Sequence, residues 1–188
     1  MKKTVVAYVL LLIICLCSCG ESDYQYVRVS VDYPMYSTAE ELVEVAQNVY
    51  IGSVTDISFE IFDMKTGKVD SSSKSESTSR MLYTIYTISV KESLKGDVSE
   101  TVKIRRVGGI TGYNEEGQYK KMKDANLIGE YKGIPRVVEE GVSLEIDGKY
   151  LFCTNSSVEG YDIVVNVIQF AHQVNSEIAT QIMNECKK

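Results

Sequence analysis

The segment from Met81 to Leu94 restricts the fold of this chain more than any other part of the sequence. Apolar and polar residues alternate along it, and one face carries Leu82, Tyr86, Ile88, Val90 and Leu94. A period of two over this length is typical of a β-strand with one buried face. The chain also has 13 tyrosines and no tryptophan, and tyrosine is enriched in strands. We therefore expect a mainly β fold.

Four further segments are predicted to be strands: residues 49–63, 101–107, 149–154 and 161–170. The first is long, and its apolar positions change parity between Val54 and Ile57, which predicts a β-bulge near Thr55. Together with residues 81–93, these segments make five main strands.

The order of the strands is typical of the OB-fold, a five-stranded Greek-key barrel with a helix or loop between its third and fourth strands. The longest irregular segment, residues 110–141, lies at that place, and a short helix over residues 119–126 is expected within it. We predict a five-stranded OB-fold-like antiparallel barrel with an N-terminal helix and a C-terminal helix.

The N-terminal helix is expected over residues 38–47, because overlapping capping boxes begin at Ser37 and Thr38. The C-terminal helix is expected to begin at Asn175 or Ser176, either of which can cap it.

The first residues of the chain form a targeting segment. Two lysines precede an apolar run over residues 5–17, which is too short to span a bilayer, since spanning needs about 18 or more residues. The run ends in Leu16-Cys17-Ser18-Cys19, which resembles the lipobox of bacterial lipoproteins. The resemblance implies cleavage just before Cys19 and a diacylglyceryl thioether on Cys19. An ordinary secretory signal, cut without lipidation, is the alternative.

These features predict three parts: a lipoprotein signal peptide over residues 1–18, a lipidated N-terminus and tether over residues 19–36, and a single OB-fold-like domain over residues 37–188. Alternation around Val27 and Val29 permits a short strand within the tether, and an extended tether is the alternative. Two acyl chains anchor a protein stably. We therefore expect the protein at the cell membrane, lipid-anchored on the extracytoplasmic face through Cys19.

Charge excludes one class of partner. Removing the two lysines of residues 1–18 from the 20 basic residues leaves 18 against 26 acidic residues, a net charge of −8. A chain this acidic repels a phosphate backbone. We expect no nucleic-acid partner.

No residue pattern predicts catalysis, a cofactor or a metal site. His172 is the only histidine and has no nucleophile motif beside it, and residues 19–188 contain no Cys-x-x-Cys. Cys153 and Cys186 can either pair, as exported proteins allow, or remain two separate thiols, which we favour. We expect a protein that is not an enzyme.

Four segments resemble a group of small exported proteins of Gram-positive bacteria, and also the netrin-like barrel of the tissue inhibitors of metalloproteinases. They are residues 46–54, 86–96, 107–109 and 148–152, and the resemblance covers most of residues 40–170. In those inhibitors a Cys-x-Cys at the mature N-terminus chelates the protease zinc. Cys17-Ser18-Cys19 has that spacing, but lipoprotein processing would remove Cys17 and modify Cys19.

The expected function is a membrane-anchored, non-catalytic binding domain for an envelope protein or a wall component. The alternative is an inhibitor of an extracytoplasmic peptidase. In either case we expect binding through long loops, over residues 64–80 or 110–141, because binding usually lies on loops carried by a rigid scaffold.

Overall fold

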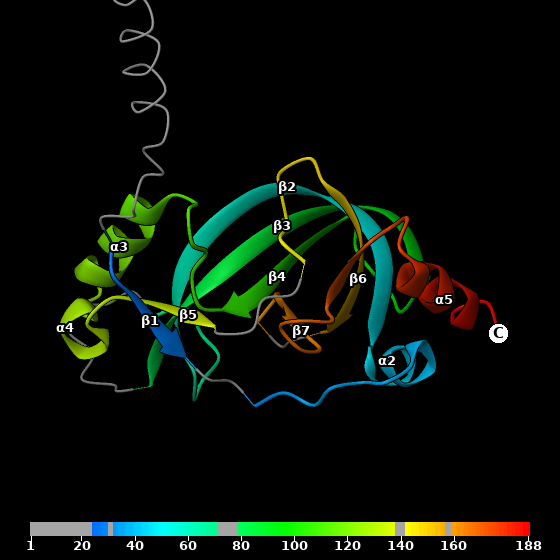
Figure 1. The fold of residues 1–188 in the computed structure, drawn as a ribbon, viewed down its shortest axis with the longest axis horizontal. Helices are drawn as coiled ribbons and strands as arrows, with labels where there is room; N and C mark the ends of the chain where they lie inside the picture. The colour runs from blue at the N-terminus through cyan, green and yellow to red at the C-terminus, as the bar shows by residue number, and fades with distance from the viewer. Residues whose placement is uncertain (1–23, 30–31, 71–78, 138–141, 157–158) are drawn as a thin grey trace, which may run out of the picture.

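The computed structural model describes residues 24–29, 32–70, 79–137, 142–156 and 159–188. The fold is mainly β, as predicted, and a sheet that closes on itself lies at its centre (Figure 1). The strands of this ring, in order of pairing, are β2 (Asn48–Asp63), β3 (Arg80–Lys95), β4 (Thr101–Val107), β7 (Asp162–Val164) and β6 (Lys149–Asn155). The ring closes where β6 pairs with the first part of β2.

One pairing in the ring is parallel. β4 runs parallel to β7, with Ile104 opposite Asp162, whereas the other neighbours in the ring are antiparallel. The expectation of a wholly antiparallel barrel is therefore wrong at this place. The reason is geometric: a closed ring with an odd number of strands cannot alternate direction all the way round.

β2 is long enough to pair with β3 over most of its length and with β6 at its start. Its register shifts between Val54 and Asp56, which confirms the predicted bulge at Thr55. Gly52 permits a close approach to β3, because a Cβ there would lie 2.9 Å from the carbonyl oxygen of Ser89. The bulge and the glycine let one strand serve both sides of the ring.

Large apolar side chains fill the ring. Several of them are almost completely buried, among them Tyr50, Tyr86, Phe152, Phe170, Ile88 and Ile104. Continuous burial of this kind is the main stabilising contribution in a domain of this size.

The strand expected over residues 161–170 is not continuous. β7 ends at Val164, and a separate strand, β8 (Ala171–Gln173), pairs with β6. Between them the buried side chain of Asn166 accepts hydrogen bonds from the backbone N–H groups of Ile168 and Gln169, at 2.9 and 2.6 Å. An asparagine that bonds its own backbone two residues on forms a turn, and this turn ends the strand.

Two helices pack together at one end of the ring (Figure 1). The first is α2 (Ala39–Val45); Thr38 and Glu41 form its capping box, one of the two predicted. The second is α5 (Glu177–Glu185), which begins after the N-cap residue Ser176, one of the two predicted.

A second, smaller sheet lies near the other end of the ring (Figure 1). It pairs β1 (Tyr26–Val29) with β5 (Ile134–Val137) in parallel. Of the two alternatives for the segment after Cys19, the structure therefore has the strand. Pairing of β1 with a strand more than 100 positions away had no signal in the sequence.

Residues 110–137 are more ordered than expected. They contain α3 (Glu115–Asp124), which begins four residues before the predicted helix, and α4 (Ile128–Tyr131) as well as β5. The buried amide of Gln118 bonds the backbone of Ile110 as both donor and acceptor, at 2.7 and 3.0 Å. This side chain supplies hydrogen bonds that hold the segment in place.

Candidate functional site

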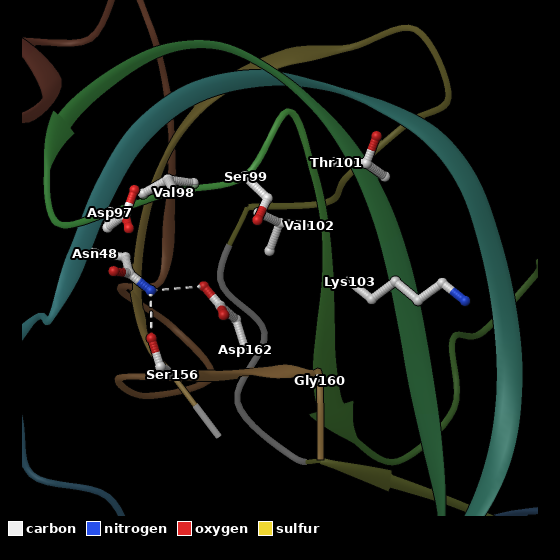
Figure 2. A pocket seen from close by; sticks show the side chains of 10 residues that line it. All are labelled: Asn48, Asp97, Val98, Ser99, Thr101, Val102, Lys103, Ser156, Gly160 and Asp162. Carbon is white, nitrogen blue, oxygen red and sulfur yellow. Dashed lines mark hydrogen bonds between the residues drawn. The ribbon is translucent and has the colours of Figure 1, made fainter. Parts of the chain in front are cut away.

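A polar pocket opens at one end of the ring, where β2 and β4 begin (Figure 2). Its volume is about 490 Å³. Its walls come from the β3–β4 turn, the start of β4, the end of β6 and the start of β7; they are lined by Asn48, Asp97, Val98, Ser99, Thr101, Val102, Lys103, Ser156, Gly160 and Asp162. Pockets of about 300–1,000 Å³ are the usual size for small ligands.

Asn48 and Asp162 form the centre of this pocket. The amide nitrogen of Asn48 donates to the Asp162 carboxylate at 3.1 Å and to the hydroxyl of Ser156 at 2.9 Å (Figure 2). The buried hydroxyl of Thr154 donates to the same carboxylate oxygen of Asp162. Two strands, β2 and β6, thus hold the carboxylate of β7 in a fixed position.

Tyr50 lies behind this network on β2. Burial, assisted by the negative charge of Asp162, raises the pKa of the Tyr50 hydroxyl well above its usual range, although Thr154 acts in the opposite direction. The phenol therefore stays neutral at physiological pH and adds no charge beside the Asp162 carboxylate.

The lining chemistry suits a neutral, hydroxyl-rich ligand. Asp97 and Asp162 can accept hydrogen bonds, and the hydroxyls of Ser99 and Thr101 can both donate and accept them. Among the described residues of the lining, Lys103 carries the single cationic side chain. Within the described ranges, no three His, Cys, Asp or Glu side chains come together as a metal centre would require.

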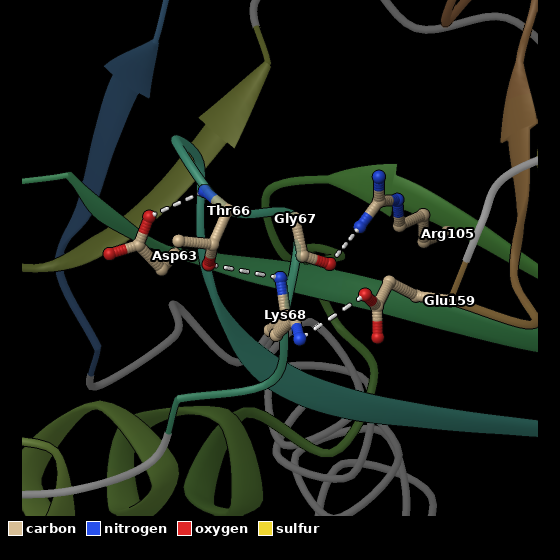
Figure 3. Close-up of polar contacts among 6 residues, drawn as sticks. All are labelled: Asp63, Thr66, Gly67, Lys68, Arg105 and Glu159. Carbon is tan, nitrogen blue, oxygen red and sulfur yellow. Dashed lines mark hydrogen bonds and ion pairs between the residues drawn. The ribbon is translucent and has the colours of Figure 1, made fainter.

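The loop after β2 packs down beside β4 (Figure 3). The Asp63 carboxylate accepts from the backbone N–H of Lys65 and Thr66, at 2.7 and 3.0 Å, and Arg105 donates to the carbonyl of Gly67 at 2.6 Å. Lys68, at the end of this turn, lies 3.7 Å from Glu159 (Figure 3). The first part of the predicted binding loop 64–80 is therefore a turn held by hydrogen bonds. Residues 71–78 of that loop lie outside the described residues.

An aromatic cluster lies under this turn. The Phe62 ring contacts the rings of Tyr83 and Tyr161, with centroids 5.1 and 5.2 Å apart. The guanidinium of Arg105 lies 5.2 Å from the Phe62 centroid. The guanidinium of Arg105 thus makes a cation–π contact with Phe62 and a hydrogen bond to Gly67. Because these contacts explain its position, we do not propose that Arg105 binds a ligand.

The other residues that the sequence singled out lie apart from the polar pocket. His172 is half-buried on β8, opposite Leu151, and burial lowers its pKa. Cys153 and Cys186 are two free thiols, as favoured from the sequence. Burial raises the pKa of Cys153 strongly, which keeps it protonated and unreactive. Cys19 lies outside the described residues.

The sequence did not single out Asn48, Thr154 or Asp162 as a site. Asn48 and Asp162 stand at the first positions of their strands, where a polar residue is unremarkable as a pattern. One signal in the sequence could have indicated the site: a buried strand begins with the carboxamide of Asn48. Because buried polar groups need hydrogen-bond partners, that side chain can be expected to contact other polar residues.

No protein-family model matches this sequence, and no curated protein matches it either. None of the helices in the described part of the chain has the length and apolar character needed to cross a membrane.

Proposed function

We propose that this chain is an extracytoplasmic lipoprotein, anchored through lipid on Cys19, whose barrel is a non-catalytic binding domain for a wall component. The observation that carries the proposal is the polar pocket. There the buried Asn48 holds the carboxylate of Asp162 at the base of a hollow of about 490 Å³. A carboxylate held in place in this way is suited to accept hydrogen bonds from the hydroxyls of a sugar, because Asn48 and Thr154 both bond the same oxygen, Oδ2.

The strand connections support an OB-fold-like barrel. Counted along the chain, the ring strands β2, β3, β4, β6 and β7 take positions one to five, and α3 and α4 fall between the third and the fourth. The parallel pair joins the third and the fifth.

The charge of the protein then indicates which class of ligand such a barrel would bind. OB-folds bind oligonucleotides and oligosaccharides. The net charge of −8 after residue 18 opposes an oligonucleotide, and the pocket lining has two carboxylates and one lysine. An oligosaccharide of the cell wall is therefore the ligand class that we assign to the pocket.

Sedimentation with insoluble cell-wall glycan tests this proposal. The purified chain from residue 20 onward should co-sediment with the glycan, and Asp162→Asn should reduce the bound fraction several-fold, because it replaces an acceptor by an amide of the same shape. Asp124→Asn is the matched control: Asp124 is exposed on α3 and pairs only with Lys120 in the described structure. This variant should bind like the wild type.

Equal sedimentation of all three proteins, or of none, would contradict the assignment of the pocket. Specific retention of an extracytoplasmic peptidase from envelope extract, without retention of glycan, would instead favour the alternative function, peptidase inhibition.

A further inference from the structure

A second cavity lies at the opposite end of β4, and it contains a buried arginine. Val102, Ile104 and Arg106 alternate on the inner face of β4, so the chain places a guanidinium where its neighbours place apolar groups. Arg106 is 8% exposed. The guanidinium of an arginine side chain carries a positive charge in proteins.

The hydrogen bonds of Arg106 are incomplete. Nη1 donates to the hydroxyl of Tyr86 at 3.3 Å. Nε is buried and has no hydrogen-bond partner among the described residues. Within the part of the chain that the structure describes, no carboxylate lies within ion-pair distance of Arg106. A buried charge without a counter-charge is strongly unfavourable, so this arrangement calls for a partner that the described residues do not supply.

The space next to Arg106 fits such a partner. The cavity has a volume of about 90 Å³ and is lined by Tyr86, Arg106 and two backbone segments around Thr111 and Ser143. Thr111 and Ser143 are exposed, so the cavity opens to solvent beside their hydroxyls. None of the described residues that line it is acidic.

We infer that this cavity binds an oxyanion group, a carboxylate or a phosphate, through the Nε–Nη2 edge of Arg106. This edge offers two parallel N–H donors, the geometry that planar oxyanions accept in bidentate pairs. The hydroxyls of Thr111 and Ser143 stand at the mouth as further donors. Because the cavity holds only the anionic group, the remainder of a larger ligand would lie outside.

This site is separate from the polar pocket and does not depend on the function proposed for it. The two cavities share no lining residue: Asp162 lines the first and Arg106 the second. The two proposals can therefore fail independently.

Thermal unfolding of the full-length mature protein in a nonionic detergent tests the inference. At constant ionic strength, with chloride as the reference, acetate and inorganic phosphate are titrated separately. The wild type should gain about 3–6 °C in Tm at ten times the Kd of the preferred anion, and the gain should saturate. A gain with acetate alone assigns a carboxylate, and a gain with phosphate alone assigns a phosphate.

Arg106→Met should abolish the anion-dependent gain and should unfold no earlier than the wild type does in chloride, because it removes an unpaired charge. Arg105→Met is the matched control: it is the same change one position along β4, on the outer face, where Arg105 contacts Gly67. This control should keep the gain. Equal gains in Arg106→Met and the wild type, or no saturable gain with either anion in the wild type, would overturn the inference.

A direct measurement covers the case in which Arg106→Met does not fold. The ¹⁵N–¹H resonance of the Arg106 Nε should shift on titration of the wild type with the preferred anion, and the shift should follow the same Kd as the gain in Tm. An Nε resonance that is unchanged at saturating concentrations of both anions would refute the site.

Discussion

Gly96 lies directly against Asn48. A Cβ on Gly96 would overlap the side-chain oxygen of Asn48 and would come within 2.6 Å of the carbonyl oxygen of Gln47. Gly96 also has a φ of +86°, in the left-handed region that favours glycine. The turn that follows β3 therefore packs against Asn48, which holds the Asp162 carboxylate. The geometry of the polar pocket thus depends on Gly96, although Gly96 does not line the pocket.

Gly96→Ala should lower the free energy of unfolding by about 1–3 kcal/mol, because alanine is strained at this φ and its methyl group displaces Asn48. Urea unfolding measures the effect. Gly129→Ala is the control, since a Cβ at Gly129 meets nothing within 4 Å and alanine favours a helix. Equal stability of the two variants would show that the contact at Gly96 is unimportant.

Leu42→Ala should lower the free energy of unfolding by about 2–5 kcal/mol, the range for removing a fully buried leucine side chain. Leu42 on α2 is 1% exposed. Val45→Ala, on the same helix but 38% exposed, should change stability much less. Both variants can be compared by urea unfolding, and a loss below 1 kcal/mol for Leu42→Ala would place α2 outside the cooperative core.

His172 should make the fold less stable in mild acid. Burial lowers its pKa in the folded state below the ordinary value of 6.5, so the unfolded chain binds the proton more readily. Its contribution to stability is complete above about pH 6.5 and is lost as the pH falls through the folded-state pKa. Between pH 7.5 and pH 5, the Tm of His172→Gln should therefore fall less than that of the wild type. Parallel curves would exclude this residue as the cause.

Cys19→Ala should leave an uncleaved precursor without lipid, because the thiol that accepts the diacylglyceryl group is gone. Mass spectrometry of the membrane fraction should find acyl mass on Cys19 in the wild type and none in the variant. A mature wild-type N-terminus at another residue, without acyl mass, would contradict the lipoprotein assignment.

Strands β2, β3, β4 and β6 were predictable to within two residues at each end, because period-two alternation is a local signal. Elements that depend on contacts with distant parts of the sequence could not be predicted. β1 has its partner in β5, and the turn at Asn166 depends on a side chain that bonds its own backbone. In each case the deciding interaction leaves no periodic pattern.

The candidate site was beyond sequence reasoning for a related cause. Asn48 and Asp162 are 114 positions apart, and β6 brings them together because it pairs with both β2 and β7. No single strand shows in its sequence which strands will be its neighbours. The sequence did not indicate that Arg106 is buried, for a different reason. Alternation along β4 places Arg106 on the same face as Val102 and Ile104, but the arginine can be recognised as inward-facing only when that face is known to be the buried one.

If Cys19 carries lipid, as proposed, the pairing of β1 with β5 would limit how far the protein reaches from the membrane. The five peptide steps from Cys19 to Tyr24, the first described residue, can span about 18 Å at most. Over Tyr26–Val29 the backbone is already paired with β5. A protein anchored in this way would stay close to the bilayer, and a ligand displayed at the outer boundary of the cell would lie out of range.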